Sequence, residues 1–333
     1  MVQISEPGVG AQRPRPALAS IVVPVYNESG NLAVLAEAVA RALPDQPYEL
    51  IFVDDGSRDA TFEEIDRLAA GNPSICGVRL SRNFGHQYAL SAGLRQARGQ
   101  VVIMMDGDMQ HPPSVLPELI AQWRQGYNIV QAQRHDTRQT SWFKRTTSRM
   151  FYRLFGALCG IPMDPGMADF RLVDRMVLDE LLAMQEGQLF LRGLIAWMGY
   201  RRAVVPFEVG QRYSGRSKYT LRKMLRFAKS GIFAFSAVPL RIAIVVGLLT
   251  ALFSFAELMF VVYVHFFSDA KTQAGWASTV AIMSLLFGVL FLLIGLQGEY
   301  ILRIYERVQR RPPFLIERIV RQNAPVDDSK TKN

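Results

Sequence analysis

Four short apolar stretches in the first third of the chain alternate with stretches of helical periodicity. The apolar stretches are residues 20–25, 48–53, 75–80 and 101–105, and the helical patterns cover 31–43, 61–70 and 88–97. Strands that alternate with helices at this spacing predict βαβ units and a parallel sheet. We therefore expect an α/β domain whose sheet is mainly parallel. No Gly-x-Gly-x-x-Gly follows the first stretch, so the dinucleotide-binding fingerprint is absent.

The fourth apolar stretch ends abruptly in Asp106, Gly107 and Asp108. Ligands of open α/β sheets bind just outside the carboxyl ends of the strands. Two carboxylates that flank a small residue can hold a hard divalent cation, and such a cation can hold a diphosphate. Gln110 can add a carbonyl oxygen. We therefore expect a Mg²⁺ or Mn²⁺ site at Asp106, Asp108 and Gln110. A lone Asp-x-Asp is also common in polar turns, so how strongly this motif supports a metal site depends on the rest of the chain.

Further carboxylates follow the other predicted strands. Glu28 comes after the first strand and Asp55 after the second, as Asp106 comes after the fourth. Strand-end carboxylates can accept hydrogen bonds from ribose hydroxyls and base N–H groups. Each of them alone could be a helix cap, and Asp59 is expected to be one. Their convergence at one edge favours a nucleotide site.

Six motifs resemble those of a known family. The segments VVPVYNE, VDDGSRD, LSRNFG and MDGDMQ, in this order and spacing, resemble family-two glycosyltransferases of the Rossmann-like GT-A fold. Residues 166–172 and 212–219 resemble the polyisoprenyl-phosphate branch, which includes bactoprenol glucosyltransferase and dolichyl-phosphate mannose synthase. The resemblance covers roughly residues 18–315. Processive polysaccharide synthases carry Gln-x-x-Arg-Trp, whereas here His135 follows Arg134, which speaks against processive polymerisation.

The resemblance implies roles for individual residues. The expected nucleotide-binding residues are Pro24, Tyr26, Glu28, Asp55, Asp106, Arg212 and Lys218. The expected acceptor-phosphate residues are Arg134, Lys144, Arg145 and Ser148. Asp108 and Asp169 are the expected catalytic residues, with Asp169 in the place of a candidate base. A phosphate monoester is already largely ionised near neutral pH, with a second pKa of about 6, so Asp169 could instead orient Arg134 or Lys144 or bind the sugar.

Basic residues crowd the stretch from Arg134 to Arg153. This stretch predicts either a solvated basic face or a cradle for a lipid phosphate. The net charge of +9 fits anionic lipid or phosphate partners. No zinc-finger spacing and no RNA-binding aromatic motif indicates a nucleic-acid partner.

Two long apolar segments, residues 242–267 and 272–298, can each cross a hydrocarbon core of about 30 Å. Arginines crowd their outer flanks, so the positive-inside rule places both flanks, and hence the catalytic domain, in the cytoplasm. The resemblance to bactoprenol glucosyltransferases implies that this membrane is the inner membrane of a bacterium. Residues 221–235 alternate basic and apolar side chains as an interfacial amphipathic helix does. Small residues in both spans favour helix packing, and we expect a homo-oligomer through these helices.

The expected domains follow from these features. They are a disordered arm (1–17), a GT-A domain (18–219), an interfacial amphipathic helix (220–237), two transmembrane helices (238–298), and a cytoplasmic juxtamembrane helix and tail (299–333). Within the GT-A domain, residues 187–200 are expected to form a helix and 202–209 a strand. Trp197 and Met198 are expected in the core.

The sequence thus predicts a metal-dependent glycosyltransferase. The resemblance implies that it transfers a sugar, with inversion, from a nucleotide sugar to undecaprenyl phosphate, and UDP-glucose is the expected donor. Aminoarabinose, an N-acetylhexosamine or mannose are alternative sugars. Two other classes stay open: a non-catalytic nucleotide-sugar-binding scaffold, and a lipid flippase or channel built on the C-terminal helices.

Overall fold

The computed structural model describes residues 12–135, 167–184, 191–208, 238–267, 275–309 and 311–322. The chain divides into two units. The sheet unit contains residues 1–157, 161–219 and 312–333, and the helical unit contains residues 158–160 and 220–311. Lys144, Arg145, Ser148, Arg212, Lys218 and the predicted interfacial helix lie outside the described residues.

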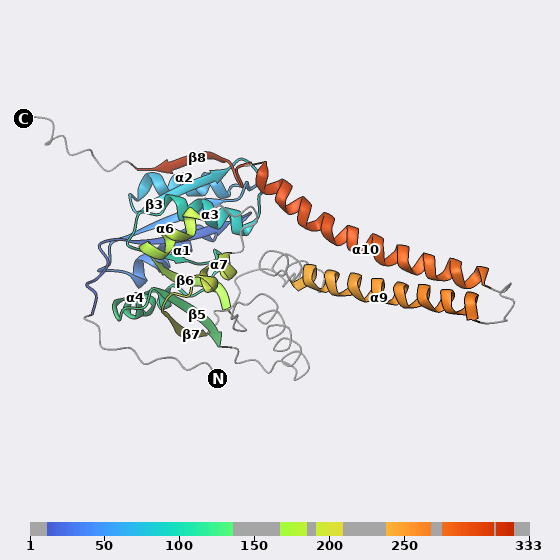
Figure 1. Cartoon of the computed structure of the whole chain (residues 1–333). Coiled ribbons are helices and arrows are strands. Elements are labelled where there is room, and N and C mark those ends of the chain that lie inside the picture. Colours follow the sequence, from blue (N-terminus) through green and yellow to red (C-terminus); the bar gives the residue numbers. More distant parts are fainter. Residues whose placement is uncertain are drawn as a thin grey trace, which may run out of the picture. The chain divides into compact units, whose positions relative to one another are not determined.

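Within the described residues, the sheet unit is built on one eight-stranded sheet in the order β7-β5-β6-β4-β1-β2-β3-β8 (Figure 1). The strands are β1 (Ala19–Val25), β2 (Tyr48–Asp54), β3 (Ile75–Leu80), β4 (Val101–Met104), β5 (Ile129–His135), β6 (Met167–Asp174), β7 (Arg202–Glu208) and β8 (Ile316–Arg321). The helices are α1 (Leu32–Ala42), α2 (Thr61–Gly71), α3 (His86–Gln96), the 3₁₀ turn η1 (Pro113–Val115), α4 (Leu116–Arg124), α6 (Arg175–Ala183) and α7 (Leu191–Trp197).

The predicted α/β fold is confirmed, and its sheet is mixed. Among the described strands, four neighbouring pairs are parallel (β1–β2, β1–β4, β2–β3 and β5–β7) and three are antiparallel (β3–β8, β4–β6 and β5–β6). The four strands predicted in the first third of the chain, β1 to β4, pair only in parallel with one another. The antiparallel pairs all involve strands from later in the chain.

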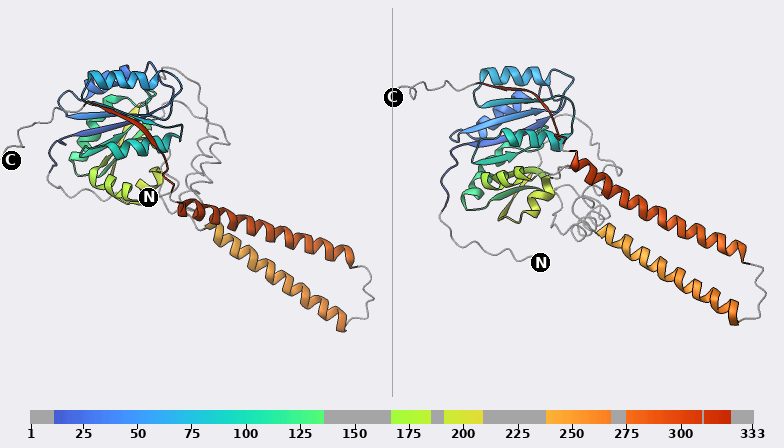
Figure 2. Two further views of the ribbon diagram at one scale, coloured as in Figure 1. Left: turned by 90° about the horizontal axis from the view of Figure 1, so that it is seen from above. Right: turned by 45° about the horizontal axis from the view of Figure 1, so that its top comes forward.

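The core lies on both faces of the central strands. Side chains of α1, α2 and α4 pack with Ile21 and Val23 of β1 on one face. On the other face α3 approaches so closely that a Cβ at Gly93 would stand 2.4 Å from Val22 Cγ1 and 2.7 Å from Val53 Cγ2. Figure 2 shows helices on both sides of the sheet. Burial on two faces explains why β1, β2 and β4 read as continuous apolar runs.

The C-terminal segment corrects one predicted domain boundary. Residues 299–333 were expected to form a juxtamembrane helix and tail, but residues 316–321 form β8, which pairs antiparallel with β3 (Figure 1). Val320 packs over Gly77, where a Cβ would stand 2.6 Å from Val320 Cγ2. Apolar and charged residues do not alternate strictly along this edge strand, IERIVR: Val320 packs toward the core, whereas Ile319 is 46% exposed. Sequence analysis missed β8 because these residues show no clear period of two.

The N-terminal segment corrects a second boundary. Residues 1–17 were expected to be a disordered arm, but residues 12–17 lie against the sheet unit. The guanidinium of Arg13 donates to Asp174 Oδ2 at 2.7 Å and stacks over Trp123 at 5.1 Å. Trp123 Nε1 donates to the same oxygen at 2.6 Å. The Pro- and Arg-rich composition that suggested disorder supplies the arginine that holds this segment in place.

The expected helix and strand after residue 187 are confirmed as α7 and β7. The expectation that Trp197 lies in the core is wrong. Its side chain is 62% exposed, because it ends α7 beyond the buried residues Leu191, Leu194 and Ile195.

The helical unit contains α9 (Val238–Phe267) and α10 (Trp276–Val308), which lie side by side (Figures 1 and 2). By length and composition, residues 238–260 and 285–305 are candidate membrane spans. The first overlaps the predicted segment 242–267. The second overlaps 272–298 and continues to Tyr305, past Glu299 and Arg303, which form an ion pair at 3.3 Å.

One buried carboxylate joins four segments of the sheet unit. Glu49 of β2, whose side chain is 4% exposed, accepts hydrogen bonds from Ser20 Oγ (2.6 Å) and from Arg98 N (2.7 Å) and Nε (3.1 Å). Arg321 of β8 donates to it at 3.2 Å. Glu49 therefore ties the end of the chain to the strands that carry the predicted site.

We expect Glu49→Gln to lower the free energy of unfolding by roughly 3 kcal/mol, because two arginines would then face an uncharged buried amide. Heat denaturation of the detergent-solubilised chain measures this as a lower melting temperature. Glu63→Gln, on the exposed face of α2, is the matched control. Equal melting temperatures for the two variants would contradict the role of Glu49.

Candidate active site

Three parallel strands bring the predicted carboxylates to one edge of the sheet. Val25 at the end of β1 is in register with Asp54 at the end of β2, and Val22 of β1 is in register with Met104 at the end of β4. The residues that follow these strands, including Glu28, Asp55 and Asp106, therefore emerge at the same carboxyl edge. The predicted convergence follows from the parallel register.

Asp55 holds the loop between β3 and α3. Its two carboxylate oxygens accept hydrogen bonds from the backbone N–H groups of Phe84 (2.7 Å) and Gly85 (2.9 Å). Gly56 next to it has a φ of +69°, and a Cβ there would stand 2.5 Å from the carbonyl carbon of Arg82. Burial raises the pKa of Asp55, although both backbone hydrogen bonds oppose that effect. Asp55 and Gly56 thus fix the start of α3 against the site.

The Asp-Gly-Asp turn is closely packed against β1. A Cβ at Gly107 would stand 2.9 Å from Val25 Cγ1, so the position between the two aspartates must stay small. Met109 has a φ of +61°, a conformation rare for a residue with a side chain. Gln110 donates to Asp108 through its backbone N–H (3.1 Å) and its side-chain amide. This turn presents Asp106 and Asp108 at the carboxyl edge with a defined backbone.

His111 supports Asp106 from inside the protein. The backbone N–H of Asp106 donates to Nδ1 of His111 at 2.9 Å, so in the neutral imidazole Nε2 carries the proton. Nε2 lies 3.6 Å from Asp106 Oδ2. The ring is buried, stacks on Phe170 at 4.9 Å and meets Phe207 edge-on at 5.9 Å. Burial lowers the pKa of His111 although the nearby carboxylates oppose it, which favours the neutral form.

The antiparallel strand β6 brings Asp169 to the same edge. Arg171 of β6 is in antiparallel register with Met104, the last residue of β4. Asp169, two residues before Arg171, therefore lies near Asp106, two residues after Met104. His86, at the start of α3, lies between them: its Nε2 is 3.5 Å from Asp106 Oδ1 and 3.4 Å from Asp169 Oδ2. The two aspartates are 63 positions apart in the sequence, yet a single imidazole contacts both.

Asp169 is bound by an arginine of α7. Arg192 donates through Nε to Oδ1 at 2.6 Å and through Nη2 to Oδ2 at 2.7 Å, and Gln87 Nε2 donates to Oδ2 at 3.0 Å. Arg171 Nη2 lies 3.7 Å from Oδ1. Asp169 and Arg171 are each 3% exposed. The predicted base is thus a buried, ion-paired carboxylate in this structure.

The ion pairs change how these groups titrate. Burial alone would raise the pKa of Asp169, but hydrogen bonds from His86 and Arg192 and the two arginine charges hold it well below its usual value. Burial lowers the pKa of Arg171 to about 10. Burial also lowers the pKa of His86, but the hydrogen bond to Asp169 and the charge of Asp106 outweigh it and raise that pKa overall.

The Asp-Gly-Asp turn fits a divalent cation that a diphosphate helps to hold. Oδ1 of Asp106 is buried and has no hydrogen-bond partner among the described residues, although His86 lies nearby. Within the described residues no group of three or more His, Cys, Asp or Glu side chains forms a metal cage. Mg²⁺ is commonly bound through one or two carboxylates plus substrate phosphates instead of an all-protein cage. Asp106, Asp108 and Gln110 supply hard oxygen ligands of that kind.

The remaining described residues that were predicted for the site have the following positions in the structure. Pro24 is buried in β1 and Tyr26 is 42% exposed beyond it. Glu28 accepts a hydrogen bond from Asn31 Nδ2 at 2.8 Å. Arg134 is exposed near the end of β5. The nucleotide and acceptor roles of these residues stay predictions.

Four residues of this cluster were missed as functional candidates: His86, Gln87, His111 and Arg192. His86 and Gln87 follow the Asn-Phe-Gly loop, and His111 follows Gln110 directly, so each stands beside a motif that was recognised. Arg192 lies in an apolar helix, where a single arginine among residues that face the core was the available signal.

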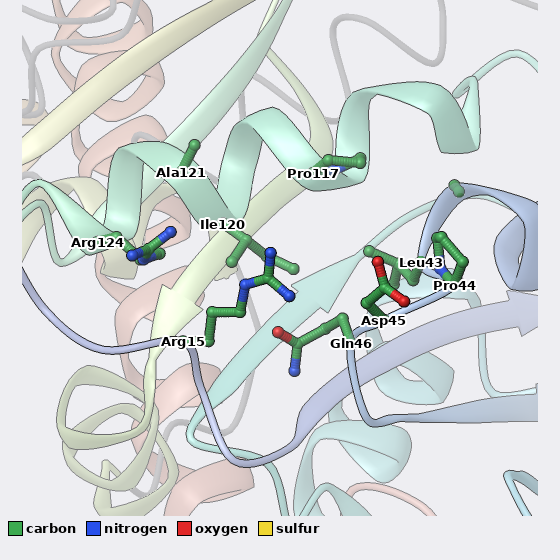
Figure 3. A pocket seen from close by; sticks show the side chains of 10 residues that line it. Arg15, Leu43, Pro44, Asp45, Gln46, Pro117, Ile120, Ala121 and Arg124 are labelled. Carbon is green, nitrogen blue, oxygen red and sulfur yellow. The ribbon is translucent and has the colours of Figure 1, made fainter.

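A separate pocket of about 200 Å³ lies at the other end of the strands (Figure 3). Leu43, Pro44, Asp45 and Gln46, which precede β2, line one side, and residues of α4 with Arg15 line the other. None of the described residues predicted for the site borders it.

Comparisons with known proteins bear on the whole chain. The model of the family "Glycosyl transferase family 2" matches residues 20–182. Uncharacterized glycosyltransferase YkcC of Bacillus subtilis is 38% identical over 304 residues, which cover 90% of this chain and 93% of that protein. Uncharacterized glycosyltransferase sll0501 of Synechocystis is 38% identical over 299 residues, covering 89% and 94%.

The bactoprenol glucosyl transferase of Shigella phage SfII is 36% identical over 306 residues, which cover 91% of this chain and 99% of that protein. Among solved structures, mannosyltransferase PcManGT from Pyrobaculum calidifontis, in complex with GDP-Man and Mn²⁺, aligns with a TM-score of 0.48 at 19% identity, covering 91% of this chain and 89% of that one. A structural likeness of this size adds nothing to the assignment. The sequence relatives span nearly the full chain, and this chain therefore belongs to glycosyl transferase family 2 and is a glycosyltransferase.

Proposed function

We propose that this glycosyltransferase transfers glucose from UDP-glucose to undecaprenyl phosphate at the cytoplasmic face of the bacterial inner membrane. The observation that carries the proposal is the similarity to a bactoprenol glucosyl transferase over 91% of this chain, including both candidate membrane spans. The carboxylates at the edge of the sheet support it, because they suit a nucleotide sugar. The two apolar helices suit an acceptor that resides in a membrane.

In the proposed reaction, residues at the carboxyl ends of β1, β2 and β4 bind the sugar donor. Glu28 and Asp55 bind the nucleoside beside Pro24 and Tyr26, while Asp55 also holds the β3–α3 loop. Asp106, Asp108 and Gln110 hold Mg²⁺ or Mn²⁺. When bound, such a cation stabilises the negative charge of the departing diphosphate. Arg212 and Lys218 add positive charge there.

The phosphate of the lipid acceptor is bound by Arg134 and by three residues that follow it in sequence, Lys144, Arg145 and Ser148. An oxygen of the lipid phosphate attacks the anomeric carbon, the bond from that carbon to the diphosphate oxygen breaks, and UDP leaves, so the configuration inverts. The second pKa of a phosphate monoester is about 6, so the attacking oxygen needs no base near neutral pH. Positioning and charge stabilisation are what the protein supplies.

Inverted and right-side-out membrane vesicles that contain the chain test substrate and orientation together. We expect added UDP-glucose, which does not cross the membrane, to yield glucosylated undecaprenyl phosphate only in vesicles whose cytoplasmic face is outside. A panel with UDP-N-acetylglucosamine, UDP-aminoarabinose and GDP-mannose tests the donor. Transfer from another donor with none from UDP-glucose would replace the sugar in the proposal, and transfer in right-side-out vesicles alone would overturn the orientation.

We expect Asp108→Asn to lower turnover by about a hundredfold or more, because loss of outer-shell partners alone typically costs 10–100-fold in metal affinity or activity. Divalent-dependent donor binding should weaken in parallel, and EDTA should abolish turnover by the wild type. Asp179→Asn, which changes a side chain that is 61% exposed on α6, is the control. Full activity in metal-free buffer would contradict the metal site.

We expect Arg134→Ala to raise the KM for the lipid acceptor, or to lower kcat, by about tenfold to a hundredfold while donor affinity is unchanged. The loss of one charge-assisted hydrogen bond costs about 1.5–3 kcal/mol, which corresponds to a change of this size in the affected constant. Arg212→Ala should show the converse, with weaker UDP binding by calorimetry. If Arg134→Ala weakens donor binding and leaves the lipid dependence unaltered, the basic stretch belongs to the nucleotide side.

A further inference from the structure

Arg192 is the solvent-facing member of its ion pair with Asp169. The Arg192 side chain is 28% exposed, whereas that of Asp169 is 4% exposed. Two hydrogen bonds, at 2.6 and 2.7 Å, hold the guanidinium side-on against the carboxylate. A ligand that approaches this part of the site therefore meets the guanidinium before it meets the carboxylate.

The side chain of Asp169 is held in place by its contacts. Its oxygens accept from Arg192 and from Gln87, and they lie 3.4 Å from His86 and 3.7 Å from Arg171. A carboxylate that is surrounded by donors and cations holds its charge and its orientation, and it is a poor proton acceptor. The contacts of Asp169 thus suit it to fix the position of a neighbouring side chain.

Two of the side chains around Asp169 are cationic. Two guanidinium groups, those of Arg171 and Arg192, face the single carboxylate of Asp169. His86 joins Asp169 to Asp106, whose charge a divalent cation would balance. Guanidinium groups bind phosphoryl oxygens with directed, charge-assisted hydrogen bonds.

The backbone that carries Arg192 is fixed as well. Leu191, Leu194 and Ile195 of α7 are 2–3% exposed, so the apolar face of this helix is buried on both sides of Arg192 in sequence. A guanidinium held by a rigid helix and a buried carboxylate loses little conformational freedom when it binds a ligand.

We infer that Arg192 binds a phosphoryl oxygen of the reactants and that Asp169 is the positioning residue that orients its guanidinium. This inference rests on the proposed function. The phosphoryl group belongs either to the diphosphate of the donor or to the phosphate of the lipid acceptor, which offer the same chemistry. Arg192 would then stabilise negative charge at the reacting centre, with no proton transferred to Asp169.

The experiment uses the full chain in detergent with two measurements. Calorimetry with UDP and Mn²⁺ measures the donor side, and the KM for undecaprenyl phosphate at saturating donor measures the acceptor side. We expect Arg192→Ala to weaken one of the two by about tenfold to a hundredfold, and the affected side identifies the phosphate. Arg192→Lys, which keeps the charge and loses the two-point contact, should retain part of the binding.

The matched control is Arg13→Ala, which removes another arginine–aspartate pair of 2.7 Å on the same strand, β6, away from the site. We expect this variant to be less stable and to bind both substrates as the wild type does. If Arg192→Ala does not fold, Arg192→Lys and Asp169→Asn carry the test. Unchanged constants on both sides for a folded Arg192 variant would overturn the inference.

A double-mutant cycle separates positioning from base catalysis. If Asp169 positions Arg192, Asp169→Asn weakens the same side as Arg192→Ala, and combining them costs little more than either alone. If Asp169→Asn lowers kcat alone and its effect multiplies with that of Arg192→Ala, Asp169 is a base and the inference fails. Absence of transfer by the wild type with any sugar donor would instead refute the proposed function.

Discussion

The site depends on strand β6 running antiparallel between β4 and β5. Parallel strands alone bring Glu28, Asp55 and Asp106 to one edge, because each strand delivers its end there. β6 enters the sheet at that edge, so the residues at its beginning, including Asp169, lie beside the end of β4. The ion pair between Asp169 and Arg192 then fastens α7 to the same place.

The supports of the site are mostly buried polar groups with defined partners. Asp55 accepts a hydrogen bond from the backbone of the β3–α3 loop, and Nδ1 of His111 accepts one from the backbone N–H of Asp106. Gly56 and Gly107 lie where a side chain would meet a neighbouring segment. At the opposite side of the unit, Glu49 joins Arg98 and Arg321, which ties β8 to the central strands. The supports other than Glu49 limit movement of a carboxylate or loop at the carboxyl edge of the sheet.

Sequence reasoning found the features that depend on local pattern. Apolar runs followed by Asp55 or Asp106 predicted both the central strands and the edge at which they end. It missed β5, β6 and β8, because strands that form antiparallel pairs with distant parts of the chain are specified by their pairing partners, which periodicity does not identify. Arg192 was missed for the same reason, since its importance comes from Asp169, 23 residues earlier and on another element. Trp197 was misplaced because composition alone does not tell which end of a short helix leaves the core.

The central claim is that the carboxyl edge of β1, β2 and β4 binds the donor and that Arg192 faces a phosphoryl group there. An experimental structure of the full chain with UDP, Mn²⁺ and a short-chain polyprenyl phosphate tests it most directly. The account predicts anomalous scattering from manganese beside Asp106 and Asp108, with Arg192 within hydrogen-bonding distance of a phosphoryl oxygen and still paired with Asp169. A nucleotide bound at the amino ends of the strands, or a phosphate contacted by neither Arg192 nor the Asp-Gly-Asp turn, would contradict it.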